Sequence, residues 1–281
     1  MPAIELVTTE WLAAHLADPD LVVLDGSYYL PTAGRDAEAE YRAAHIPGAI
    51  RFDIDAVKDK ASPLPHMLPD PESFGEAVAR MGIGDGTRVV AYDGAGLFSA
   101  PRVAWTFRTF GAQRVAVLDG GLPAWLAEGR PTESDEPPAR AARTFTPRFD
   151  RNAVAGIEDV RRALEAGSAQ VLDARSRSRF TGEELEPRAG MRSGHMPGAI
   201  NLHYGSLLRD GRLADPAAIE DVLRRAGATR DRPVVTSCGS GVTAAILLLA
   251  LERAGWPTPR LYDGSWAEWG SRADTAVTTG P

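Results

Sequence analysis

The chain has 281 residues, 44% of them hydrophobic and 25% charged, which is typical of a folded globular protein with room for about two domains. A formal net charge of −7 argues against nonspecific binding to nucleic acid, because such binding needs a basic surface. No CxxC or HExxH spacing accompanies the five histidines, so no metal site is predicted, and the single cysteine excludes an internal disulfide.

The start of the chain does not resemble a targeting segment. Residues 1–16 carry Glu5 and Glu10 and no basic cluster, unlike a signal or transit peptide. The longest wholly apolar stretch, residues 244–251, is far too short to cross a bilayer. A lone cysteine also fits a reducing compartment, and we therefore expect a cytoplasmic protein.

Short apolar segments alternate with amphipathic segments along the chain, which predicts parallel sheets with helices on both faces. In the first half, strands are expected at 21–25, 88–92 and 115–118, and helices at 10–17, 71–81 and 100–110. In the second half, strands are expected at 170–173, 233–237 and 260–262, and helices at 157–166, 216–226 and 242–253. The stretch between the halves is rich in proline, arginine, serine and glutamate, which predicts an extended linker at 131–150 between domains 1–130 and 151–281.

The two halves repeat each other. His45–Ile50 (HIPGAI) returns as His195–Ile200 (HMPGAI), and Val-Leu-Asp at 23–25 returns at 171–173. The Asp-Gly-Gly turn at 119–121 with Trp125 returns as Asp-Gly-Ser at 263–265 with Trp269. Blocks that recur in the same order over so long a period predict two homologous domains rather than a solenoid.

Cys238 stands where a β-branched run meets a short loop, and an apolar helical run follows the loop. This order predicts a strand, a tight loop and a helix, with the sulfur at the carboxyl end of the strand. A lone cysteine is often only a small buried hydrophobe. Here Gly239 and Gly241 allow the backbone to wrap around an anion, and the helix dipole favours thiolate, which predicts a nucleophile or a sulfur carrier.

The matching position in the first half is Asp93, in Val89-Val90-Ala91-Tyr92-Asp93-Gly94. The first domain has kept the strand and the turn but carries no thiol. We therefore expect one active site, in the second domain.

The twin His-x-Pro-Gly-Ala segments, the paired Asp-Gly turns with their tryptophans and the cysteine loop resemble the two-domain rhodanese-like sulfurtransferases over nearly the whole chain. The resemblance implies an α/β fold of two tandem rhodanese-like domains, each a mostly parallel sheet flanked by helices. The loop Cys-Gly-Ser-Gly-Val-Thr at 238–243 is similar to that of members that use 3-mercaptopyruvate. Members that use thiosulfate typically carry basic residues directly after the cysteine, where this chain has Gly239 and Ser240.

The resemblance implies a mechanism for the loop. Cys238 would attack the sulfur of 3-mercaptopyruvate, release pyruvate and hold a persulfide. A thiophilic acceptor, such as a thiol, reduced thioredoxin or cyanide, would then take the sulfur. The persulfide anion needs hydrogen-bond donors, and the loop supplies successive amides at Gly239, Gly241, Val242 and Thr243.

Two arginines match the substrate clamp of the family. Arg179 and Arg188 precede the second His-x-Pro-Gly-Ala block. A 2-keto acid presents a planar carboxylate beside a carbonyl, and guanidinium groups are well shaped to bind both. We therefore expect these two side chains to hold the sulfur donor.

A Ser-His-Asp set that would deliver a proton to the departing enolate is also implied by the resemblance. The matching positions are Ser240 in the loop, and Asp55 and His66 from the first domain. Pro65 stands before His66 where a polar residue is expected, so this loop departs from the family pattern. His45 and His195 belong to the repeated structural segments, where they are expected to support a turn rather than to act in catalysis.

Other functions remain open at this stage. Thiosulfate could be the main donor, or the chain could be a non-catalytic rhodanese-like binding protein. A cysteine phosphatase requires Cys-x5-Arg, but Ala244 stands at the arginine position and Ser237 precedes the cysteine. We expect no cofactor, no nucleic-acid partner, and a monomer or weak dimer that acts on a small sulfur donor and a thiol acceptor.

Overall fold

A computed structural model describes residues 3–134 and 137–281 of the chain, which divide into two compact units. The first unit comprises residues up to Lys60, Leu68–Asp150 and the short segment Asp210–Leu213. The second unit comprises Ala61–Met67, Arg151–Arg209 and Ala214–Pro281. Each unit therefore includes one short segment from the half of the sequence that otherwise forms the other unit: 210–213 in the first unit and 61–67 in the second.

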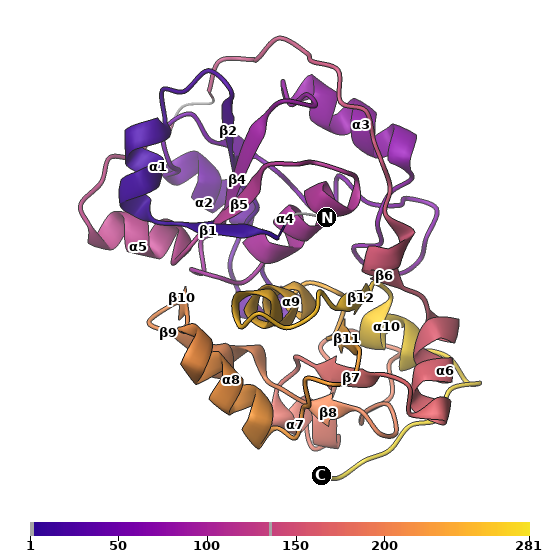
Figure 1. Ribbon diagram of the computed structural model, residues 1–281. Coiled ribbons are helices and arrows are strands. Elements are labelled where there is room, and N and C mark those ends of the chain that lie inside the picture. Colours follow the sequence, from indigo (N-terminus) through magenta and orange to yellow (C-terminus); the bar gives the residue numbers. More distant parts are fainter. Residues whose placement is uncertain (1–2, 135–136) are drawn as a thin grey trace. The chain divides into compact units, whose positions relative to one another are not determined.

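The first unit contains a five-stranded sheet in the order β1-β5-β4-β2-β3, in which every neighbouring pair is parallel (Figure 1). Its strands are β1 (Glu5–Val7), β2 (Leu21–Asp25), β3 (Ile50–Arg51), β4 (Arg88–Tyr92) and β5 (Val115–Leu118), and β10 (Arg212–Leu213) also falls in this unit. Its helices are α1 (Thr9–His15), α2 (Ala37–Ala43), α3 (Pro71–Arg80), α4 (Ala100–Thr109) and α5 (Gly121–Ala127), with a 3₁₀ turn, η1, at Pro31–Ala33.

The second unit repeats this architecture, with a parallel sheet in the order β6-β12-β11-β7-β8. Its strands are β6 (Val154–Ala155), β7 (Gln170–Asp173), β8 (Ile200–Asn201), β9 (Leu208–Arg209), β11 (Val234–Ser237) and β12 (Arg260–Tyr262). Its helices are α6 (Ile157–Ala166), α7 (Arg177–Thr181), α8 (Pro216–Arg225), α9 (Ala244–Arg253) and α10 (Ser265–Trp269), with 3₁₀ turns η2 at Arg151–Ala153 and η3 at Tyr204–Leu207. The fold class predicted from the sequence is confirmed.

Corresponding helices in the two units begin with the same chemistry. Asp70 precedes Pro71 at the start of α3, and its carboxylate accepts a hydrogen bond from the Ser73 amide at 2.9 Å. At the start of α8, Asp215 precedes Pro216 and accepts from the Ala218 amide at 2.9 Å. An aspartate cap followed by proline at the first helical position fixes where each helix starts, and such a cap contributes about 1 kcal/mol.

Apolar residues alternate between the two faces of each sheet. In the first unit, α1 and α5 cover one face, where Leu12 and Trp125 pack on Val23 and Val90. The aromatic rings of α3 and α4 pack against each other, and Phe74 stacks on Phe110 with ring centroids 4.2 Å apart. In the second unit, the corresponding packing residues from helices and strands are Val160, Val171, Val235, Tyr262, Trp266 and Trp269.

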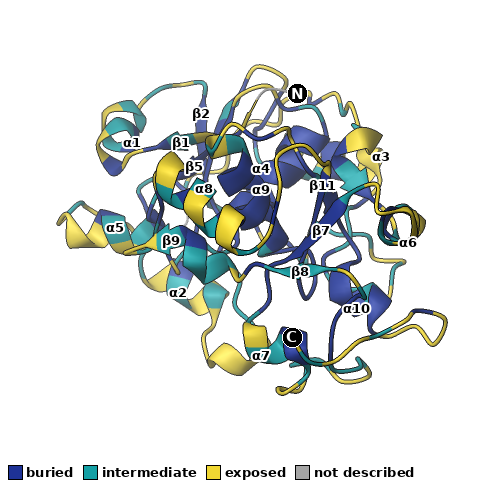
Figure 2. Cartoon of the chain, turned by 60° about the horizontal axis from the view of Figure 1, so that its bottom comes forward, coloured by how far each residue is buried: buried dark blue, intermediate teal, exposed yellow. Residues whose placement is uncertain are grey.

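Helix α9 is buried on all sides, unlike its neighbour α8. Figure 2 shows α9 in dark blue and an exposed yellow face on α8, which agrees with burial of every residue from Ala244 to Leu251. Apolar side chains all around a helix are expected where no side meets water. Among the described helices, none combines the length and the apolar character that crossing a membrane requires.

The segment expected to be a linker, 131–150, is extended where it is described and belongs to the first unit. The His45 amide donates to the Glu133 carbonyl at 2.8 Å, and the Arg148 amide donates to the Phe110 carbonyl at 2.8 Å. Residues 135 and 136 lie outside the described residues. This segment therefore has backbone partners along the first unit, although its described residues form no helix.

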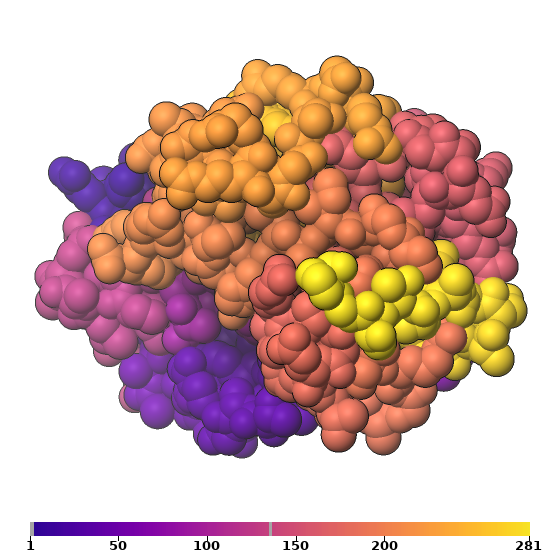
Figure 3. All heavy atoms as spheres, turned by 90° about the horizontal axis from the view of Figure 1, so that it is seen from below, coloured from indigo at the N-terminus to yellow at the C-terminus, as the bar shows by residue number. Residues whose placement is uncertain are grey.

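The C-terminal residues lie against the second unit. Figure 3 shows them in yellow across atoms that the colour bar places near residues 180–200. The backbones of His195 and Thr278 bond reciprocally, and the Gly280 amide donates to the Thr181 carbonyl at 2.8 Å. The backbone at the start of the second His-x-Pro-Gly-Ala block is therefore paired with the C-terminal residues.

Candidate active site

Cys238 directly follows β11, the central strand of the second sheet, and α9 begins six residues later at Ala244. The cysteine is 2% exposed. Its position at the carboxyl end of a central parallel strand is the edge at which α/β folds place their ligand sites. The sequence prediction of a strand, a loop and a helix at this point is confirmed.

The loop is held by the start of α10. The Cys238 amide donates to Ser265 Oγ at 3.2 Å, and that hydroxyl donates to the Tyr262 carbonyl at 2.8 Å. The Trp266 amide donates to the Cys238 carbonyl at 2.9 Å, and the Ala267 amide donates to the Gly239 carbonyl at the same distance. The repeated Asp-Gly-Ser turn therefore serves as the support of the cysteine loop.

The two loop glycines are needed for different reasons. Gly241 has φ +77°, a conformation that side chains other than glycine rarely adopt. Gly239 has no such constraint on φ, but a Cβ added there would lie 2.8 Å from Nη2 of Arg179. The guanidinium group of Arg179 therefore lies directly against the cysteine loop.

Arg179 is held in this place by Glu186. Arg179 Nε donates to Glu186 Oε1 at 3.3 Å, and Arg179 Nη2 donates to Glu186 Oε2. The side chain of Glu186 is 1% exposed and that of Arg179 is 13% exposed. A charge-assisted pair with this little solvent fixes the direction of the guanidinium group.

A second arginine completes the network behind the first. Arg175 Nη1 donates to Glu186 Oε1 at 2.7 Å, and its Nη2 donates to Asp173 Oδ2 at 2.6 Å. Its guanidinium carbon also lies 4.3 Å from the ring centre of Trp266. Burial alone would lower the pKa of Arg175, but the carboxylates of Asp173 and Glu186 outweigh it and raise that pKa.

His66 groups with the second unit, although it comes from the first half of the sequence. It is 4% exposed, and its Nε2 lies 3.1 Å from Nη2 of Arg188. Because a guanidinium group can only donate, Nε2 is the acceptor and the ring carries its proton on Nδ1. His66 also has φ +59°, a conformation that is uncommon outside glycine and concentrates at functional sites.

Ser240 and Val242 are buried in the cysteine loop, and Thr243 is the residue at which α9 begins to turn. Asp55 belongs to the first unit, where its Oδ1 accepts from Lys58 Nζ at 3.1 Å and its side chain is 40% exposed. Within the second unit, the structure thus pairs Arg188 with His66 and places Arg179 against the loop. The relay of Asp55, His66 and Ser240 stays a prediction.

Sequence reasoning missed the supporting residues of this site. Asp173 and Ser265 lie in repeated blocks, so the duplication could have pointed to them. Arg175 and Glu186 carry no such signal, because neither lies in a repeated block and they pair with each other across a loop. By contrast, His195 Nδ1 lies 2.9 Å from the Phe180 carbonyl, as expected of a histidine that supports a turn.

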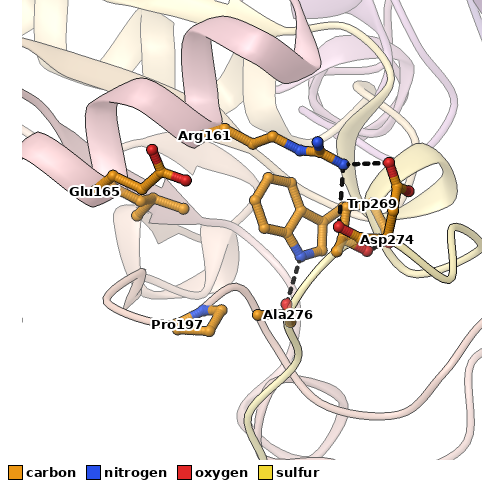
Figure 4. A pocket seen from close by; sticks show the side chains of 8 residues that line it. Arg161, Glu165, Pro197, Trp269, Asp274 and Ala276 are labelled. Carbon is orange, nitrogen blue, oxygen red and sulfur yellow. Dashed lines mark hydrogen bonds and ion pairs between the residues drawn. The ribbon is translucent and has the colours of Figure 1, made fainter.

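A separate hollow of about 330 Å³ opens between α6, α10 and the C-terminal residues (Figure 4). Arg161 and Asp274 at its edge pair at 2.8 Å, and the Trp269 indole donates to the Ala276 carbonyl at 2.8 Å. None of the residues predicted for the active site lines this hollow. This hollow is therefore distinct from the candidate site at the cysteine loop.

Comparison of the sequence with protein-family models identifies the same two repeats, and the second match contains the cysteine loop. The rhodanese-like domain model matches residues 8–128 and again residues 157–272. The chain belongs to the rhodanese family. Both rhodanese-like domains are present, and the predicted family is confirmed.

Individual rhodanese-family relatives match over nearly the full length. A protein of Escherichia coli (strain K12) named 3-mercaptopyruvate sulfurtransferase is 43% identical, with 96% of each chain covered. An Arabidopsis thaliana protein named thiosulfate/3-mercaptopyruvate sulfurtransferase 1, mitochondrial, is 40% identical over 97% of this chain and 77% of its own. The crystal structure of SseA from Escherichia coli, described as a 3-mercaptopyruvate sulfotransferase with the rhodanese fold, superposes with a TM-score of 0.86 at 39% identity and covers 94% of this chain and 99% of its own.

Proposed function

We propose that this protein is a sulfurtransferase that takes sulfur from 3-mercaptopyruvate and passes it, through a persulfide on Cys238, to a thiophilic acceptor. The observation that carries the proposal is the position of the Arg179 guanidinium, which faces Gly239 beside the only thiol of the chain. The names of the relatives support the same reaction.

The proposed first step forms one bond and breaks one. The Cys238 thiolate attacks the sulfur of 3-mercaptopyruvate, a sulfur–sulfur bond forms, and the carbon–sulfur bond gives its electron pair to the departing enolate of pyruvate. The enolate carbon then takes a proton. The persulfide can supply that proton, so no oxidant, reductant or cofactor enters the step.

We assign a role in this step to several groups around Cys238: some bind the charges of the donor, others bind the persulfide, and others guide the proton. Arg179 and Arg188 are proposed to hold the carboxylate and carbonyl of the donor through guanidinium N–H groups. The amides of Gly239, Gly241, Val242 and Thr243 are proposed to bind the persulfide anion. His66, with Ser240 and Asp55 as proposed partners, would guide the proton.

The donor choice follows from loop chemistry. Thiosulfate carries two negative charges and would gain from cations on the loop, yet Gly239 and Ser240 supply none. A keto acid needs only guanidinium donors from the side. Thiosulfate remains the rival donor, because two relatives from Arabidopsis thaliana are named for both substrates. For the acceptor we propose a low-molecular-weight thiol or a thioredoxin-like dithiol, and the predicted cytoplasmic location and oligomeric state stay predictions.

The test is a mass measurement with a product assay. Incubation with 3-mercaptopyruvate is expected to add the mass of one sulfur atom to the protein and to release pyruvate. A reducing thiol should remove the added sulfur, and Cys238→Ser should show neither effect. A wild-type protein that gains no sulfur from either donor would overturn the proposal, and equal kcat/KM for both donors would overturn the donor assignment.

A further inference from the structure

The buried carboxylate of Glu186 lies between Arg175 and Arg179. Its Oε1 accepts from Arg175 Nη1 at 2.7 Å and from Arg179 Nε at 3.3 Å, and its Oε2 accepts from Arg179 Nη2. With the side chain 1% exposed, water screens this charge little. Glu186 is therefore electrostatically coupled to whatever binds beside Arg179.

The contacts also decide which end of Arg179 is available. Glu186 occupies Nε and Nη2, the pair of donors that would otherwise bind a carboxylate side-on. No described residue accepts a hydrogen bond from Nη1 of Arg179. A donor molecule therefore meets this arginine at Nη1.

The charges of the network cancel. Asp173 and Glu186 are paired with Arg175 and Arg179, and the side chains of Asp173 and Arg175 are both 0% exposed. Arg179 thus faces the loop as a hydrogen-bond donor whose charge is largely neutralised. A neutralised arginine therefore attracts an anion with two charges less strongly than an unpaired arginine would.

We propose that Glu186 is a positioning residue that sets donor selectivity through Arg179, by fixing its Nη1 group and by withholding net positive charge from doubly charged donors. This rests on the proposed sulfur-transfer function. In this proposal Glu186 touches neither the donor nor the sulfur. It nevertheless determines the preference between 3-mercaptopyruvate, which has one charge, and thiosulfate, which has two.

The experiment compares steady-state kinetics of both donors for Glu186→Gln and wild type. Glu186→Gln should raise the ratio of kcat/KM for thiosulfate to kcat/KM for 3-mercaptopyruvate about tenfold, because the unbalanced guanidinium charge acts on one more unit of donor charge. KM for 3-mercaptopyruvate should rise more than kcat falls. An unchanged ratio in an active, folded variant would overturn the inference.

Two variants separate charge from shape. Glu184 lies two residues away, is exposed, and accepts from Ser178 Oγ, so Glu184→Gln makes the same charge change outside the network. Its donor ratio should stay within about twofold of wild type because solvent screens this position. Glu186→Asp keeps the charge and should raise KM for both donors without moving the ratio, and a ratio that moves as in Glu186→Gln would overturn the charge mechanism.

If Glu186→Gln does not fold, a neutral pair of substitutions replaces it. Arg179→Gln alone leaves Glu186 uncompensated and should lower the ratio of kcat/KM for thiosulfate to kcat/KM for 3-mercaptopyruvate about tenfold. The double variant Arg179→Gln with Glu186→Gln restores the charge balance and should return this ratio to within about twofold of wild type. A double variant that keeps the ratio of Arg179→Gln would overturn the inference. Persulfide formation by the wild type is measured in parallel, so a failure of the proposed function is seen as loss of the mass gain and is distinguishable from a failure of this inference.

Discussion

The two units carry the same strand, loop and helix, but the loop holds a carboxylate in one and a thiol in the other. In the first unit, the carboxylate of Asp93 accepts four backbone amides at 2.8–2.9 Å, from Ala95, Phe98, Ser99 and Ala100. In the second unit, Cys238 stands at the same position relative to its strand. In the first unit, the Asp93 carboxylate thus occupies a ring of backbone amides like the ring that we propose for the persulfide of Cys238.

The supports of the two loops also correspond. The Leu122 amide donates to the Asp93 carbonyl at 3.0 Å, as the Trp266 amide does to the Cys238 carbonyl at 2.9 Å. An arginine paired with a glutamate faces the glycine after each of these residues: Arg35 with Glu40 in the first unit and Arg179 with Glu186 in the second. The first pair is 40% and 38% exposed and the second 13% and 1%, so only the second is shielded from water. Burial of the arginine pair, more than its presence, distinguishes the unit with the thiol.

The largest expected effect is on kcat/KM, when Arg179 is replaced and the result is compared with replacement of Arg35 in the first unit. Arg179→Ala should lower kcat/KM for 3-mercaptopyruvate by about 10- to 100-fold, the usual loss for a hydrogen bond to a charged group. Arg35→Ala makes the matching change in the first unit and should leave kcat/KM within about twofold, because an exposed pair contributes little. Equal losses in the two variants would mean that the first unit also binds the donor.

Removal of the Asp93 carboxylate should lower the stability of the protein and leave persulfide formation on Cys238 intact. Asp93→Ala leaves four backbone amides, of which those of Ser99 and Ala100 are buried, without their acceptor, and should lower the free energy of unfolding by about 3 kcal/mol. Chemical denaturation with a fluorescence readout measures this loss, and Asp93→Asn, which keeps one acceptor oxygen, should lose less. A folded Asp93→Ala protein should still form the persulfide on Cys238. A stability equal to that of wild type would show that the amide ring does not need an anion.

The smallest effects separate the two glycines of the cysteine loop. Gly241→Ala places a side chain at φ +77° and should lower the free energy of unfolding by about 1 kcal/mol. Gly239→Ala meets the end of the Arg179 side chain and no backbone atom, so it should change the melting temperature little and raise KM for 3-mercaptopyruvate a few-fold. The reverse assignment of effects would contradict the placement of Arg179 against the loop.

The sequence predicts the regular elements of this fold closely, and the reason is local. Strands 21–25, 88–92, 115–118, 170–173 and 260–262 have the expected bounds, and the helices differ by at most two residues at either end. Apolar runs and aspartate–proline caps act over a few residues, so their pattern is visible in the chain. Short elements such as β3, α7 and β8 were not predicted, because two to five residues show no period.

The site was predictable only where a motif repeats or matches a family. Cys238 and its glycines are recognised in this way. The bridge from Arg175 to Glu186, and the grouping of His66 with the second unit, depend on loops that return to the sheet after irregular intervals. Such contacts follow from tertiary packing, and local propensity does not encode them.

The chain has one cysteine, which is 2% exposed, and this has a consequence for measurement. Any reagent that modifies a thiol in this protein can label only one atom, so the amount of label equals the number of intact reaction centres in a preparation. Compact alkylating agents should reach that atom sooner than bulky ones, and the donor should delay both. The protein therefore carries its own quantitative reporter of occupancy, without any engineered tag.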